Sequence, residues 1–212
     1  RNQKRGRLDK RMLHRIPMGS RELFKNTIVK DDKPIDVCLL VDESGSMGGH
    51  RIRQARRSCI ALKEVLEENP KLNLWVMGHT ADGYEWHDQQ NTTNMTVYNS
   101  PTIKDRHYSL GSMTAKCENR DGNAILAAAG KVTQEIVMSD GAPAAINYGG
   151  TRGMEHVRDV VRGLESKGWG VIQVGFGGAS FQDRMFTNHI FVDDTTKLAD
   201  KVGKIIRKVI KV

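Results

Sequence analysis

The stretch Val37-Cys38-Leu39-Leu40-Val41-Asp42-Glu43-Ser44-Gly45-Ser46-Met47 places five apolar residues directly before a polar, glycine-containing loop. A short apolar run that ends in turn residues is typical of a β-strand buried on both faces. In a parallel sheet covered by helices, ligands bind in the crevice outside the carboxyl ends of the strands. We therefore expect a buried strand over 36–41 and a binding loop over 42–47.

Outward from this stretch, expected strands alternate with amphipathic helices. The first helix is indicated by apolar residues at steps of three and four, namely Ile52, Ala55, Cys59, Leu62 and Leu66. The remaining pattern predicts strands over 72–80, 134–139, 171–175 and 190–192, helices over 121–131 and 151–167, and short edge strands at 84–87 and 95–98. It also predicts a closing helix whose inner face carries Leu198, Val202, Ile205, Ile206 and Val209. This order predicts an α/β fold with a parallel sheet that helices cover on both faces.

The net charge of the chain is unevenly distributed. The 212 residues contain 33 Lys and Arg against 25 Asp and Glu, a formal charge of +8. Residues 1–15 hold seven bases against one acid, and residues 195–212 hold six against one, so residues 16–194 carry a net −3. We expect two parts, a basic N-terminal arm over 1–33 that packs on or leads into the domain, and an α/β domain over 34–212.

Several function classes are disfavoured by the residues that are absent. The apolar runs are shorter than the ~20 residues of a membrane-spanning helix. Three cysteines without a CxxC pair argue against a disulfide framework and favour a reducing, cytoplasmic setting. The seven histidines show no HExxH spacing, so we do not expect zinc.

No nucleophile with a positioned base is recognisable, so the chain is not expected to be an enzyme by itself. It begins at Arg1 without an initiator methionine, which suggests a piece of a longer polypeptide.

The loop after the first strand has the residues of a cation site. Asp42, Ser44 and Ser46 stand at alternate positions and can turn toward one point, while Gly45 eases the curvature. Asp140 follows another expected central strand and would complete the set. Oxygen-only donors suit a hard cation, so we expect Mg²⁺, or Mn²⁺ or Ca²⁺.

Asp42-x-Ser44-x-Ser46, together with Ser139-Asp140-Gly141 after a later strand, resembles the metal-ion-dependent adhesion site of von Willebrand factor A (VWA) domains. The resemblance covers about residues 34–212 and implies an α/β fold with a Rossmann-like, doubly wound, mostly parallel sheet that has one antiparallel edge strand. It also implies that Ser44 and Ser46 bind the cation directly, that Asp42 and Asp140 act largely through water, and that an acidic side chain of a partner fills an open position.

Three further motifs resemble the CobT-type subunits of aerobic cobaltochelatase, which carry a C-terminal VWA domain. They are Glu118-Asn119-Arg120-Asp121-Gly122-Asn123-Ala124-Ile125, Ser139-Asp140-Gly141-Ala142-Pro143 and Gly6-Arg7-Leu8-Asp9-x-Arg11-x-Leu13-x-Arg15. This resemblance implies an AAA+ ATPase of the CobS/MoxR kind as partner, in metal insertion related to cobalamin biosynthesis or in remodelling. CobT-type subunits normally carry a long acidic segment before the VWA domain, which this chain does not show.

The threonine that VWA domains supply to the cation is not matched here. Ungapped counting puts Asn119 at its position, the nearest threonine is Thr114, and Asp121 lies close by. Asp121 is either a ligand or the N-cap of the helix that follows it. As a ligand it would bring the carboxylate charge to −3, leaving −1 with a divalent ion, and a more firmly held, more structural cation.

The function expected from these observations is a non-enzymatic, cation-binding VWA module that acts as adaptor for an AAA+ ATPase. Two alternatives stay open: a nucleic-acid-associated module that uses the basic termini, and a homo-oligomer in which the metal is structural. Salt-dependent nucleic-acid binding that is lost without residues 1–15 would favour the first alternative.

Overall fold

The computed structural model describes residues 2–3, 7–8, 24–25, 34–81, 92–103, 108–132, 134–141, 143–176 and 182–192. The chain divides into two compact units, Arg1–Lys33 and Pro34–Val212. The first contains the short antiparallel strands β1 (Asn2–Gln3), β2 (Arg7–Leu8) and β3 (Phe24–Lys25), paired in the order β1-β3-β2.

The second unit is an α/β domain built on a six-stranded sheet. Its elements in chain order are β4 (Ile35–Asp42), the 3₁₀ turn η2 (Gly45–Met47), α1 (His50–Glu67), β5 (Leu72–Ala81), β6 (Thr93–Asn99), α2 (Tyr108–Gly111), α3 (Asp121–Ala129), β7 (Gln134–Ser139), α4 (Gly150–Glu165), β8 (Gly170–Phe176), the 3₁₀ turn η3 (Gln182–Arg184) and β9 (His189–Val192). The strand order is β6-β5-β4-β7-β8-β9, and β6 alone among these six runs antiparallel to its neighbour. The expected fold class, a mostly parallel sheet with one antiparallel edge strand, is confirmed.

Strand β4 is buried on both faces because helices pack against both sides of the sheet. It pairs in parallel with β5 on one side and β7 on the other. Its residues Val37, Leu39 and Val41 pack with α1, while Cys38 and Leu40 pack with α3 and α4. Both alternating sets must therefore be apolar. The strand order reverses between β4 and β7, so a crevice opens outside their carboxyl ends.

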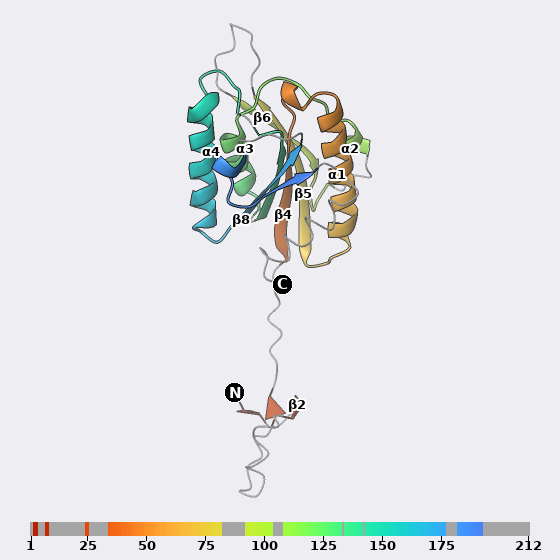
Figure 1. The fold of residues 1–212 in the computed structure, drawn as a ribbon. Coiled ribbons are helices and arrows are strands. Elements are labelled where there is room, and N and C mark those ends of the chain that lie inside the picture. Colours follow the sequence, from red (N-terminus) through yellow and green to blue (C-terminus); the bar gives the residue numbers. More distant parts are fainter. Residues whose placement is uncertain are drawn as a thin grey trace, which may run out of the picture. The chain divides into compact units, whose positions relative to one another are not determined.

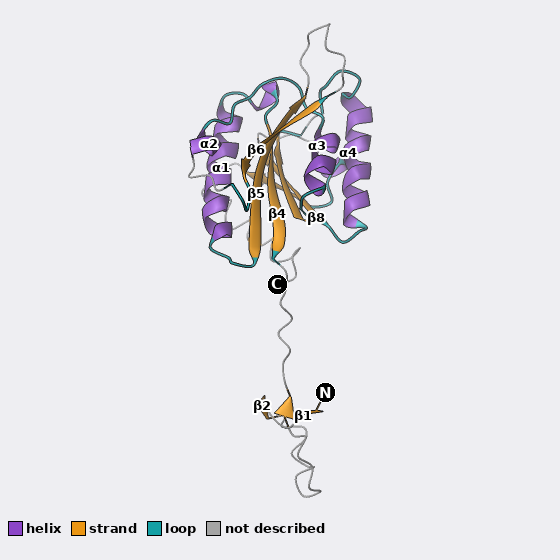
Figure 2. Ribbon diagram, turned by 180° about the vertical axis from the view of Figure 1, so that it is seen from behind, coloured by secondary structure: helices purple, strands orange, loops and turns teal. Residues whose placement is uncertain are grey.

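Helices cover both faces of the sheet, with α1 and α2 on one side and α3 and α4 on the other (Figures 1 and 2). The five apolar positions predicted to line the first helix are all buried in α1. On the other face, α4 buries Val157, Val160, Val161 and Leu164 against the sheet. In the views of Figure 1, α1, α3 and α4 begin at the edge of the sheet where β4 ends. Side chains from their first turns therefore lie near the crevice.

Most expected elements are present, with small changes of length. Strand β6 corresponds to the edge strand expected over 95–98, and the four-residue helix α2 was not predicted. The expected strand over 84–87, the expected closing helix with Leu198 to Val209 and most of the basic arm lie outside the described residues. Among the helices described, none is long and apolar enough to cross a bilayer.

Candidate metal centre

The loop after β4 brings Asp42, Ser44 and Ser46 together. The backbone N–H of Ser44 donates to Asp42 Oδ1 at 2.8 Å, and the hydroxyls of Ser44 and Ser46 lie 3.0 Å apart. The N–H of Gly45 donates to the carbonyl of Cys117 at 2.7 Å, which ties this loop to the segment before α3. Asp42 and Ser44 are buried, whereas Ser46 is exposed. The loop therefore runs from a buried carboxylate to a hydroxyl at the surface.

Asp140, directly after β7, closes the group from the other side of the crevice. Ser46 Oγ donates to Asp140 Oδ1 at 3.1 Å. Arg51, in the first turn of α1, donates from Nη1 to Asp140 Oδ2 and to the carbonyl of Ser46, both at 2.9 Å. The Arg51 side chain is 41% exposed, so this ion pair forms the outer rim of the site.

Asp121 lies deeper and is joined to Asp42 through Asn119. The amide Nδ2 of Asn119 donates to Asp121 Oδ2 at 3.0 Å and to Asp42 Oδ2 at 3.4 Å. The N-cap residue of α3 is Arg120, so Asp121 is the first helical residue and the N-cap interpretation was wrong. Thr114 is exposed, and its backbone N–H donates to Glu43 at 3.4 Å. Of the three candidates for the missing threonine, Asn119 and Asp121 lie beside Asp42.

His79 completes the group, and the sequence analysis did not select it. It pairs with Asp42 in the parallel register of β4 and β5, which puts both side chains on one face of the sheet. Its Nε2 lies 3.5 Å from Asp121 Oδ1. One ligand atom from each of Asp42, His79 and Asp121 lies within 4.8 Å of the other two, and all three residues are buried. The described residues thus include a buried cluster with two carboxylates and one imidazole.

Burial disfavours the charged form of every ionisable group in this cluster. It raises the pKa of Asp42 to about 6, against the lowering effect of the hydrogen bond from Ser44. It raises the pKa of Asp121 well above the ordinary value, with a further increase from the charge of Asp42. Burial also lowers the pKa of His79 to about 4, so the imidazole is neutral at pH 7. The cluster is therefore short of positive charge and contains a neutral nitrogen that can act as a ligand.

Arg51 changes the charge expected for the site. Burial and the charge of Asp42 raise the pKa of Asp140, and the hydrogen bond from Ser46 and the charge of Arg51 lower it. Because Arg51 contacts Asp140 directly, the three carboxylates and one guanidinium sum to −2. A divalent cation would then make the site neutral, where carboxylates alone leave −1.

The residues fit a divalent cation. Carboxylates, hydroxyls and a neutral imidazole are common metal ligands. Among the described residues, neither ring nitrogen of His79 has a hydrogen-bond partner. Asp121 Oδ1 also lacks one. Buried polar atoms are almost always partnered, because leaving one unpaired costs about 1–3 kcal/mol. A cation between them would supply the missing partner.

Glu43, although adjacent in sequence, does not belong to this cluster. It is buried and accepts hydrogen bonds from Tyr98 Oη at 2.6 Å and Lys116 Nζ at 3.1 Å. A Cβ on Gly78 would overlap the Glu43 carboxylate, so the glycine makes room for it. The Glu43 carboxylate is thus satisfied by the hydroxyl of Tyr98 in β6 and by the ammonium group of Lys116.

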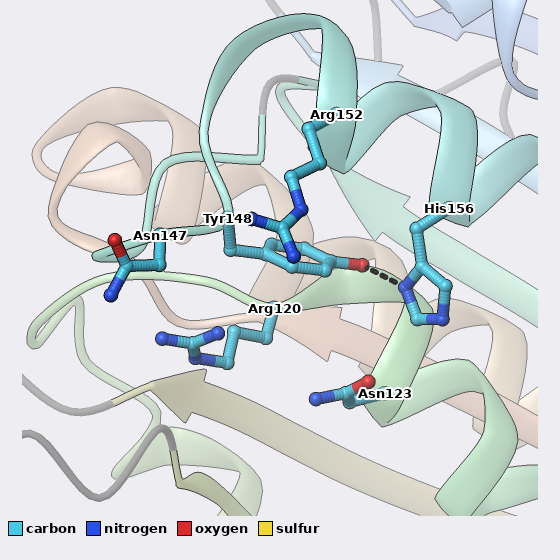
Figure 3. Close-up of a pocket in the computed structure, with 6 residues that line it drawn as sticks. All are labelled: Arg120, Asn123, Asn147, Tyr148, Arg152 and His156. Carbon is cyan, nitrogen blue, oxygen red and sulfur yellow. Dashed lines mark hydrogen bonds between the residues drawn. The ribbon is translucent and has the colours of Figure 1, made fainter.

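A basic pocket of about 330 Å³ lies next to the start of α3, and Figure 3 shows the residues that line it. It is lined by Arg120, Asn123, Asn147, Tyr148, Arg152 and His156, a set without a carboxylate. Tyr148 organises it: its hydroxyl lies 2.6 Å from His156 Nδ1 and accepts from the N–H of Gly122 at 3.0 Å. The guanidinium of Arg120 lies 5.5 Å from the centre of the Tyr148 ring. Because Arg120 directly precedes Asp121, the pocket and the metal centre share the start of α3.

His79 and Arg51 are the residues of this site that sequence reasoning missed, whereas Asn119 was among the candidates for the missing threonine. The search for histidines used local spacing, whereas His79 reaches the site through the pairing of two strands. Its place near the end of the second expected strand was the available signal. For Arg51, the available signal was its position in the first turn of the helix that follows the loop.

Comparisons in sequence find no match: no protein-family model matches the chain, and no curated protein matches it. Comparison of structures finds similar folds. The pilus adhesin SpaC of Lactobacillus rhamnosus GG is 15% identical with a TM-score of 0.56, over 86% of this chain and 30% of that one. The chain therefore spans under a third of SpaC.

Two further solved structures share the fold. A von Willebrand factor type A protein of Catenulispora acidiphila is 15% identical, with a TM-score of 0.53 over 84% of this chain and 43% of that one. The manganese-loaded TRAP protein of Plasmodium vivax is 14% identical, with a TM-score of 0.58 over 84% of this chain and 74% of that one. At these identities the likeness concerns the fold alone. Residues 34–192 therefore have the fold of a VWA domain, with a candidate cation site at the carboxyl edge of its sheet.

Proposed function

We propose that this chain is a VWA interaction module whose contact with a protein partner depends on a bound divalent cation. The observation that carries the proposal is the group formed by Asp42, Ser44, Ser46, Asp121 and Asp140 at the crevice between β4 and β7. Its deep end contains buried atoms without partners, and its rim ends in the exposed Ser46. A cation held there is screened by protein below and open to a ligand above.

The partner is proposed to present an acidic segment. A partner carboxylate would complete the coordination of the cation, as the VWA resemblance implies. The neighbouring pocket adds the guanidinium group of the exposed Arg152, and a guanidinium group can bind a carboxylate in a bidentate manner. Since both features lie at the start of α3, one acidic segment can reach both.

We propose a ring-forming AAA+ ATPase of the CobS/MoxR kind as that partner. The support is the resemblance of residues 118–125 and 139–143 to CobT-type subunits. In this role the chain is an adaptor without catalysis of its own, and nucleotide-driven movement of the ATPase is passed on through the shared cation. Metal insertion of the cobaltochelatase kind is the specific version of this proposal.

The experiment uses the full chain and a CobS/MoxR-like ATPase from the same organism. Binding is measured by biolayer interferometry in Mg²⁺, in Mn²⁺ and in EDTA. We expect binding in either metal, loss in EDTA, and loss in Asp140→Ala. Asp159→Ala, on the exposed side of α4, is the matched control and should bind like the wild type. Equal binding in EDTA and in metal would contradict the proposal.

The basic pocket is tested separately by reversing charge at two positions of one helix. Arg152→Glu, in the first turn of α4, should weaken binding of the ATPase at least tenfold, about 1.4 kcal/mol. Arg162→Glu makes the same change in the last turn, far from the crevice, and should have little effect. If both variants weaken binding equally, net charge and not the pocket attracts the partner.

A further inference from the structure

The two ring nitrogens of His79 make no hydrogen bond among the described residues that would explain a histidine at this position. It lies in β5 with none of its surface exposed, and neither ring nitrogen has a hydrogen-bond partner among the described residues. A phenylalanine would fill comparable space without the cost of burying two polar atoms. A histidine at this position therefore points to a ligand for its nitrogen.

The surroundings of His79 indicate what that ligand is. Its Nε2 faces Asp121 Oδ1 at 3.5 Å, and that oxygen also lacks a hydrogen-bond partner among the described residues. Asp42, paired with His79 in the sheet, supplies a third atom within 4.8 Å. Ligands held at about 2.1 Å from one metal ion lie ~3–4 Å apart, so a small contraction brings these three atoms into range.

We propose that His79 is a metal ligand with Asp42 and Asp121, and that the site therefore selects a transition ion such as Mn²⁺, Co²⁺ or Zn²⁺ over Mg²⁺ and Ca²⁺. Magnesium and calcium prefer oxygen ligands, whereas imidazole favours the first-row transition metals. The inference rests on the proposed cation site and names the class of ion that it takes. It departs from the Mg²⁺ and the absence of zinc expected from the sequence.

The test is metal binding by the full chain, measured by isothermal titration with Co²⁺ and with Mg²⁺. In the wild type we expect Co²⁺ to bind about 100-fold more tightly than Mg²⁺. His79→Phe should lower Co²⁺ affinity at least tenfold, and Mg²⁺ affinity should stay within about threefold. His50→Phe, at an exposed position of α1, is the control and should bind both ions like the wild type.

The outcomes separate the two proposals. If neither ion binds the wild type, both the cation site and the role of His79 are refuted. If Mg²⁺ and Co²⁺ bind equally well, or His79→Phe leaves Co²⁺ affinity unchanged, the inference about His79 fails and the cation site stands. A measurement on the wild type removes any dependence on the folding of the variant: pulsed EPR of the Mn²⁺-loaded chain should show coupling to an imidazole nitrogen. Absence of that coupling in a protein that binds Mn²⁺ would overturn the inference.

Discussion

Three carboxylates, those of Asp42, Asp121 and Asp140, lie within one hydrogen-bonded group. The guanidinium group of Arg51 contacts this group at Asp140. Without a metal, Asp42 and Asp121 are held in a state that disfavours their charge, as their raised pKa values show. The same residues that bind a cation therefore destabilise the metal-free fold. Mutations here should separate stability from binding.

Asp121→Asn provides that separation. The amide keeps the shape of the side chain and can still accept the hydrogen bond from Asn119, but it removes one buried charge. We expect the melting temperature of the metal-free chain at pH 7 to rise and the affinity for Co²⁺ to fall at least tenfold. Scanning calorimetry in EDTA and metal titration measure the two effects.

Asp159→Asn, at an exposed position of α4, controls for the change in net charge and should alter neither quantity. An Asp121→Asn variant with unchanged metal affinity would remove Asp121 from the ligands.

Site residues that lie close together in the sequence could be predicted as a group, and those that lie far apart could not. Asp42, Ser44 and Ser46 could be proposed together because one loop carries all three, and Asp140 because it also follows a strand. His79 could not be placed beside Asp42 without the register of β4 and β5, which apolar patterns do not specify to a single residue. The side-chain amide of Asn119 links two loops, because its Nδ2 donates to Asp42 Oδ2 and its Oδ1 accepts from the N–H of Ala144.

At the scale of the elements, α3 can pack closely against α4 because Gly122 has no side chain. A Cβ there would lie 2.5 Å from both Tyr148 Oη and His156 Nδ1. Alanine favours a helix over glycine by about 1 kcal/mol, but overpacking a core costs ~1–3 kcal/mol. Packing and intrinsic propensity thus act in opposite directions at this position.

We therefore expect Gly122→Ala to lower the free energy of unfolding and Gly163→Ala to raise it by about 0.5–1 kcal/mol. Gly163 is the matched control because it lies in α4 with nothing within 4 Å of an added Cβ. Urea unfolding midpoints give both values. A stabilised Gly122→Ala variant would mean that Tyr148 and His156 move aside without loss.

Elements with a long periodic pattern were predictable, and shorter ones were not. The spacing over 52–66 predicted the buried face of α1, and the run over 37–41 predicted β4, since each pattern covers several turns or a whole strand. Helix α2 has four residues, which is too few for a helical period to show. The antiparallel direction of β6 rested on the VWA resemblance, because strand patterns do not carry direction.

For the domain as a whole, pH should control how much a cation stabilises the fold. An exposed carboxyl in the unfolded chain has a pKa near 3.9, whereas that of Asp42 is raised to about 6 in the folded protein. Between these values the folded state binds more protons, so the metal-free fold loses stability as pH rises. Protons also compete with the cation for the same carboxylates.

The increase in melting temperature on adding Co²⁺ should therefore be small at pH 5 and grow toward pH 7.5. At a free concentration of about 100 times Kd, a cation adds ~2.7 kcal/mol, and each kcal/mol raises the melting temperature by about 2–4 °C in a chain of this size. Thermal melts at four pH values, with cation or with EDTA, measure the difference. An increment that is the same at pH 5 and pH 7.5 would show that these carboxylates do not bind the ion.

Because the candidate ligands come from four segments between residues 42 and 140, the site exists only when β4, β5, β7 and the start of α3 are all in place. If the folding transition state has not yet joined these segments, a cation bound this way stabilises the native state and not the transition state. Interactions absent from the folding transition state slow unfolding and leave the folding rate nearly unchanged. In stopped-flow experiments the cation should thus extend the lifetime of the native state, so that metal loss sets how long the domain keeps the surface proposed to bind a partner.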